Sequence, residues 1–106
     1  MSKIFEERER GYEAKWAHDE EKHFKVMARR NALLGRWAAG ELGLRDAQAD
    51  DYAMAVIHIG VVNKGADPVF DKIRNDFAAR KINVSDRTIH QKMEDFFHRA
   101  GDEVAE

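Results

Sequence analysis

Cysteine is absent from this 106-residue chain, and proline occurs only once. The lack of cysteine excludes disulfide bonds, thiol chemistry and metal sites built from thiolates. Seven glycines and a single proline leave little material for the many turns that an all-β fold requires. We therefore expect an all-α protein, with the cytoplasm as the simplest location for a chain without disulfides.

A dominant charge of one sign and a long apolar run are also missing. The chain has 18 basic and 20 acidic residues, a net charge of −2, and the two signs are interspersed. A nucleic-acid or anionic-membrane surface needs a patch of one sign, so neither partner is expected. The chain contains no run of eighteen apolar residues, so no membrane span is predicted. The start, MSKIFEERER, has no apolar region of the kind found in secretory signals.

The first thirty residues contain fifteen charged side chains, eight basic and seven acidic, around one narrow apolar stripe. The stripe consists of residues separated by 7, 4, 7, 4 and 7 positions: Phe5, Tyr12, Trp16, His23, Met27 and Leu34. At about 100° per residue, these six side chains fall within roughly 60° of one another on a helix. So narrow a stripe indicates a docking edge or the outer rim of a core.

The sequence predicts a helix over 18–40, which Gly40 and Gly43 should end. The apolar band of this helix widens from Phe24 onward, so we expect the helix to belong to the core from Phe24. Before Trp16 the same helix is expected to be frayed or disordered in the free protein. Its stripe is thin there, and Gly11 costs about 1 kcal/mol in a helix relative to alanine.

Three further helices follow. The first is predicted over 46–62; its β-branched run from Val56 to Val62 also suits a strand, but the acidic start and the lack of a partner strand favour a helix. The next covers 68–81, with Asp67 as N-cap and Pro68 at the first helical position.

Ser85 is the expected cap of the last helix, over 86–100, which Gly101 should end. The sequence therefore predicts a small four-helix bundle over 18–101, preceded by a segment of residues 1–17 and followed by a loose tail, 102–106.

No set of residues predicts catalysis, a cofactor or a metal. Glu20 and His23 form a Glu-x-x-His pattern of the kind found in di-iron bundles, but its only companion, Asp95 with His98, has the shorter carboxylate. The hydroxyl of Ser85 is already accounted for by helix capping, and no glycine-rich phosphate loop is present. We therefore expect a protein that is not an enzyme.

The aromatic stripe before Phe24 has two interpretations. It can pack back onto the bundle, as in a helical adaptor protein, or it can lie in a groove of another protein and order on binding. In the second case Tyr12 and Trp16 would be the expected hot spots, with Arg8, Arg10 and Lys15 meeting acidic groups beside the groove.

The first forty residues resemble the zeta-subunit inhibitors of the alphaproteobacterial F-type ATP synthase. The resemblance is carried by Phe5-x-x-Arg8-Glu9, Glu13-Ala14-Lys15, Ala17-His18-Asp19 and the run ARRNALLGRWAA from Ala28 to Ala39. It continues more weakly through Tyr52-Ala53, Asp67-Pro68-Val69-Phe70 and the last helix. The chain departs from the family pattern at Trp16, where phenylalanine is expected, and at Gly11, where a better helix former is usual.

The resemblance implies a regulatory inhibitor of ATP hydrolysis, monomeric when free and bound to the catalytic head on the cytoplasmic face of the inner membrane. Its N-terminal segment would insert at a catalytic α/β interface beside the central γ stalk and block rotation. By position, the expected contacts are Ile4, Phe5, Arg8, Arg10, Tyr12, Glu13, Lys15 and Trp16. The alternative is a helical adaptor without a link to an ATPase.

Overall fold

The computed structural model describes residues 20–63 and 67–105. Expectations that fall on residues 1–19, including the frayed start of the first helix, lie outside the described residues. Within the described ranges the chain forms four helices and no strand, which confirms the predicted all-α bundle. None of these helices combines the length and the apolarity needed to cross a bilayer.

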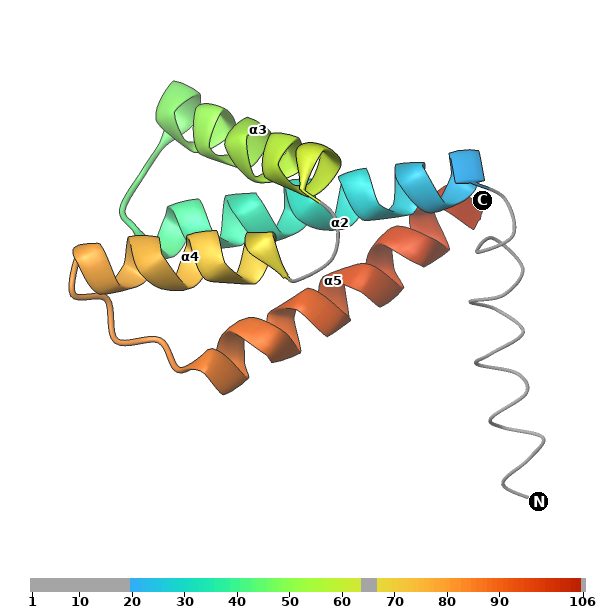
Figure 1. The fold of residues 1–106 in the computed structure, drawn as a ribbon. Coiled ribbons are helices and arrows are strands. Elements are labelled where there is room, and N and C mark those ends of the chain that lie inside the picture. Colours follow the sequence, from blue (N-terminus) through green and yellow to red (C-terminus); the bar gives the residue numbers. More distant parts are fainter. Residues whose placement is uncertain (1–19, 64–66, 106) are drawn as a thin grey trace, which may run out of the picture.

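Consecutive helices run in opposite directions, so the bundle has an up-and-down topology (Figure 1). The helices are α2 (Glu20–Glu41), α3 (Asp46–Val62), α4 (Pro68–Ala79) and α5 (Asp86–Ala105). Helix α3 is helical over the whole predicted range, 46–62, including the β-branched run that also suited a strand.

Helix α2 is the centre of the bundle, because it packs against both α3 and α5, while α4 contacts α3 and α5 (Figure 1). The main core gathers apolar side chains from all four helices. Its buried members are Leu34, Ala38, Leu42, Val56, Val69, Phe70, Ile73, Phe77, Ile89 and Met93. An edge-on contact between the rings of Trp37 and Phe77, with centroids 5.7 Å apart, lies at the border of this core.

The contact between α2 and α3 depends on small residues. A Cβ atom at Gly35 would lie only 2.7 Å from the Cα atom of Ala53, so the two backbones approach too closely there for any side chain on Gly35. Ala38 and Ala39 on α2 are fully buried as well. Small side chains on the facing surfaces therefore set the distance between the two helices.

The N-termini of the last two helices are capped as predicted. The Asp67 carboxylate accepts a hydrogen bond from the Phe70 backbone N–H at 3.3 Å, and Pro68 occupies the first helical position. The Ser85 hydroxyl accepts a hydrogen bond from the Thr88 backbone N–H at 3.1 Å. Both caps satisfy an amide that the helix itself leaves unpaired.

Two helices end in the same hydrogen-bond pattern with different residues in the left-handed position. After α2, Gly43 has φ +77°, and the Leu44 N–H donates to the carbonyl of Ala39 at 2.9 Å. After α4, Lys81 has φ +59°, and the Ile82 N–H donates to the carbonyl of Phe77 at 2.8 Å. Glycine suits this conformation, whereas lysine adopts it at an energetic cost.

The prediction that α5 ends at Gly101 and that a loose tail follows is wrong. Helix α5 continues to Ala105, and Gly101 is buried inside it. Val104 packs with Val26 and Ala100 in a second, smaller core cluster. These contacts with α2 hold the last turns in a helix despite the low helical propensity of glycine.

An ion pair reinforces the same contact between α2 and α5. The Arg29 Nε atom donates to a carboxylate oxygen of Glu103 at 2.5 Å, and Arg99 lies 3.5 Å from the other oxygen. The hydrogen bond from Arg29 is the main cause of a lowered pKa of Glu103, and it raises the pKa of Arg29. The pair is solvent-exposed, so its contribution to stability is small.

We expect Lys81→Gly to raise the free energy of unfolding by about 0.5–1 kcal/mol, because glycine adopts the left-handed conformation without strain. Urea unfolding of the variant and the wild type measures the difference. Gly43→Ala is the matched control: a Cβ there meets no atom within 4 Å, so only the backbone conformation is tested. The control should lose stability. An unchanged or lower stability of Lys81→Gly would contradict the expectation.

The second prediction concerns acid. The folded-state pKa of Glu103 lies below its ordinary value of 4.5, so its ion pair stabilises the protein above pH 4.5 and loses this effect as the pH falls through the lowered pKa. A double-mutant cycle of Arg29→Met and Glu103→Gln, followed by chemical unfolding, should show a favourable coupling at pH 7 and none well below the lowered pKa. A coupling independent of pH would exclude this role.

Candidate functional site

The eight residues predicted to contact a partner, from Ile4 to Trp16, all precede the described residues. The structure therefore neither gathers them nor separates them. It describes the base from which they extend, which is the first half of α2 and its surroundings.

Burial decreases along the apolar stripe toward the N-terminus. Leu34 is fully buried, Met27 is half-buried and His23 is exposed. These three side chains are spaced by 7 and 4 residues on one continuous helix, so they share a face as the periodicity predicts. This face is part of the core at Leu34 and is exposed at His23.

Phe24 differs from its predicted place in the core. The core begins at Val26, which is fully buried, whereas 55% of Phe24 is exposed. The width of the apolar band suggested neighbours on both sides of α2 at this level. Helix α5 covers only the side that carries Val26, through Ala100, and leaves Phe24 uncovered.

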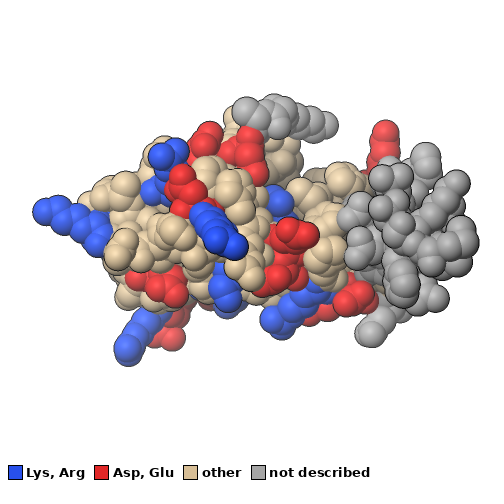
Figure 2. All heavy atoms as spheres, turned by 90° about the horizontal axis from the view of Figure 1, so that it is seen from below, with Lys and Arg blue, Asp and Glu red and all other residues tan. Residues whose placement is uncertain are grey.

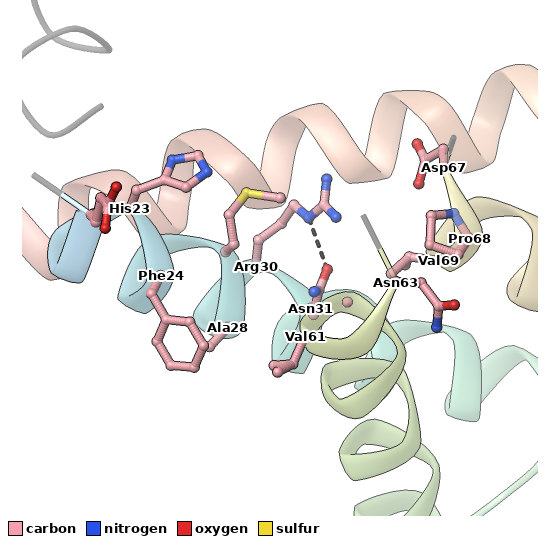
Figure 3. A pocket seen from close by; sticks show the side chains of 13 residues that line it. His23, Phe24, Ala28, Arg30, Asn31, Val61, Asn63, Asp67, Pro68 and Val69 are labelled. Atoms are coloured by element: carbon pink, nitrogen blue, oxygen red, sulfur yellow. Dashed lines mark hydrogen bonds between the residues drawn. The ribbon is translucent and has the colours of Figure 1, made fainter. Parts of the chain in front are cut away.

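A cavity of about 850 Å³ opens beside this exposed region, between the first half of α2, the end of α3 and the start of α4 (Figure 3). Asn63 and Asp67, the described residues on either side of 64–66, both belong to its wall. The described residues that line it are Glu20, His23, Phe24, Met27, Ala28, Arg30, Asn31, Gly60, Val61, Asn63, Asp67, Pro68 and Val69.

Arg30 and Asn31 are the polar centre of the cavity, and they project from α2 side by side (Figure 3). The Arg30 Nε atom donates to the Asn31 side-chain oxygen at 3.0 Å. Burial lowers the pKa of the Arg30 guanidinium, and the negative charge of Asp67 partly opposes this shift. Among the described residues, the site thus holds a partly desolvated cation with the Asp67 carboxylate as its charge partner, and the wall also carries Glu20.

Asn31 is the only buried polar residue in the described ranges, with 2% of its surface exposed. A Cβ atom on Gly60 would overlap the Asn31 side-chain amide, so the glycine makes room for it. Sequence reasoning missed both Arg30 and Asn31. The available signal was the position of Asn31 between Met27 and Leu34 at spacings of 4 and 3, a polar residue on the apolar face of a helix.

The described residues contain no group of three or more His, Asp or Glu side chains arranged to hold a metal ion. Of the Glu-x-x-His pattern, Glu20 and His23 both line the cavity. Elsewhere the charges are mixed: Figure 2 shows basic and acidic side chains side by side over the face seen from below.

The geometry suggests binding rather than group transfer. The cavity offers one cation, amide groups and an apolar rim, and no nucleophile with an adjacent base lies among its described residues. Such a surface can hold a side chain or a helix of a protein.

Comparison with known proteins gives one match. The family model described as ATPase inhibitor subunit zeta matches residues 1–103. The comparisons with curated proteins and with solved structures give no match. The matched range includes the segment before the bundle and all of the bundle except the last residues of α5, and the chain belongs to the ATPase inhibitor subunit zeta family.

Proposed function

We propose that this protein inhibits ATP hydrolysis by the F-type ATP synthase, with residues 1–17 inserted as a helix at a catalytic α/β interface beside the central γ stalk. The inserted helix would block rotation in the hydrolysis direction. The family assignment supports the inhibitor role. The proposal places the protein on the cytoplasmic face of the membrane, as a monomer when free, without catalytic activity of its own.

The observation that carries the proposal is the gradual exposure of one helical face along α2. Leu34, Met27 and His23 pass from buried to exposed toward the N-terminus, and the same spacing continues to Trp16, Tyr12 and Phe5. An apolar face that leaves its own core is available for another surface to cover. A groove in a partner can supply that surface.

The chemistry of the segment suits such a groove. Phe5, Tyr12 and Trp16 would be buried anchors, because aromatic side chains bury a large area at a small loss of rotamer entropy. Arg8 and Lys15 would lie beside them, facing acidic groups of the partner. Ordering the segment on binding costs free energy, and this cost lowers the affinity.

Removal of residues 1–18 should abolish inhibition of ATP hydrolysis and leave the bundle folded, because the core begins at Val26. Steady-state hydrolysis by the isolated catalytic head, titrated with each protein, measures inhibition, and circular dichroism with thermal unfolding measures folding. A truncated protein that inhibits as well as the full chain would place the inhibitory site on the bundle.

We expect Gly11→Ala to tighten inhibition about fivefold, because alanine lowers the cost of forming the inserted helix by about 1 kcal/mol. The inhibition constant for ATP hydrolysis is the measured quantity. Gly40→Ala is a matched control: Gly40 is exposed in the last turn of α2, and a Cβ there meets no atom within 4 Å. If the two substitutions have equal effects on inhibition, insertion of a helix containing Gly11 is excluded.

A further inference from the structure

The outward side of α3 is apolar, although none of the described helices packs on it (Figure 1). Residues 52–63 include no Asp, Glu, Lys or Arg, in a chain of which 36% is charged. Helix α3 buries only Ala53 and Val56 in the bundle. The core does not account for apolar residues on the other side of the same helix, because a helix at the surface normally carries polar and charged residues there.

Four side chains form one exposed apolar surface, the outer patch. On α3, Met54, Val61 and Val62 fall within roughly 100° of one another, on the side away from the core. Phe24 on α2 and Val61 project to the same side of the bundle (Figure 3). The exposed fractions are 55% for Phe24, 62% for Met54, 43% for Val61 and 58% for Val62.

The size of the outer patch limits what can cover it. Four apolar side chains, each about half-exposed, present on the order of 400 Å². A patch of this size on a monomer is often functional. A stable complex, however, needs about 800 Å² from each partner. The outer patch alone is therefore too small to hold two copies of this chain together, and it suits a partner that another contact already holds.

The proposed function supplies such a partner, because residues 1–17 would hold the bundle at the catalytic head. Residues 18 and 19 separate that segment from Glu20, and Phe24 lies four residues further along α2. Three Cα–Cα steps reach at most about 11 Å, and four residues of helix add about 6 Å. The head surface at the mouth of the groove therefore lies within about 17 Å of Phe24. A tether this short gives an effective concentration of the order of millimolar, at which a small contact forms.

We propose that the outer patch is a second contact surface for the catalytic head of the ATP synthase. It packs on an apolar surface of the head beside the groove that takes residues 1–17. The lack of charge over 52–63 suits this place, because charged residues are depleted in the centre of protein interfaces. The inference rests on the proposed function and extends it: the N-terminal segment blocks rotation, and the bundle slows the release of that segment.

Two substitutions of opposite charge at Val61 test this contact. Val61→Asp and Val61→Lys each place a charge in an apolar interface, so both should raise the inhibition constant for ATP hydrolysis about tenfold, mainly through faster release. Gln91→Asp and Gln91→Lys are the matched controls, because Gln91 is exposed on α5, outside the outer patch. Both controls should keep the wild-type constant, and unfolding measurements establish that all four variants are folded.

Three results of this comparison would overturn the proposal. An unchanged inhibition constant for both Val61 variants would show that the outer patch makes no contact. A rise for only one sign of charge would indicate an electrostatic effect instead of an apolar contact. An equal rise for the Gln91 variants would show that the effect does not depend on position.

Photo-crosslinking locates the surface without a measurement of inhibition. Because the chain has no cysteine, Met54→Cys and Gln91→Cys each provide a single attachment site for a benzophenone label on the full-length protein. With the catalytic head hydrolysing ATP, the label at position 54 should join the bundle to an α or β subunit, and the label at position 91 should not. Equal yields at the two positions would overturn the proposal.

The crosslinks also separate this inference from the proposed function. A labelled protein that inhibits but gives no crosslink from position 54 would overturn the second contact surface and leave the inhibitory role intact. A crosslink from position 54 in a protein that does not inhibit would refute the blocking of rotation and support the contact surface.

Sedimentation equilibrium distinguishes the head from a second copy of the chain. The free full-length protein should be monomeric at micromolar concentrations, because the outer patch is smaller than a stable dimer requires. A dimer that Val61→Asp dissociates would assign the outer patch to a second copy and overturn the proposal.

Discussion

The close approach of α2 and α3 is the constraint on which the rest of the structure depends. It is possible because Gly35 has no side chain at the point where its Cβ atom would meet Ala53. This proximity stabilises a core of modest size, because small facing residues bring two backbones together and exclude water between them. Helix α5 then packs on another side of α2, and α4 closes the bundle through α3 and α5.

Helix α2 serves two purposes along one continuous face. Its second half supplies Leu34 and Ala38 to the main core, which fixes the helix rigidly in the bundle. Its first half contacts α5 through Val26 and Ala100, while His23 and Phe24 are exposed. A rigid helix with an uncovered end is a suitable base for a segment that acts on a partner, because the bundle fixes where the segment starts.

The cavity beside that end follows from how α2, α3 and α4 pack. Arg30 is held by Asn31, and Asn31 has its place because Gly60 leaves room for it. The partly desolvated cation and the exposed Phe24 and Val61 are costly features of a small protein, and the described core does not require them. An occupant that covers them gains binding free energy.

The sequence by itself determined the features that depend on local chemistry. The caps at Asp67 and Ser85 and the helical phase of the stripe need only neighbours within a few residues, so their residue types identify them. The tertiary structure alone decided the features that depend on distant neighbours. Helix α5 passes Gly101 because its last turns pack on α2, and Phe24 is exposed because none of the described helices covers that side. Arg30 and Asn31 line a cavity because α3 ends and α4 begins beside them. Periodicity specifies which residues share a face, but only the packed helices determine how much of that face is covered.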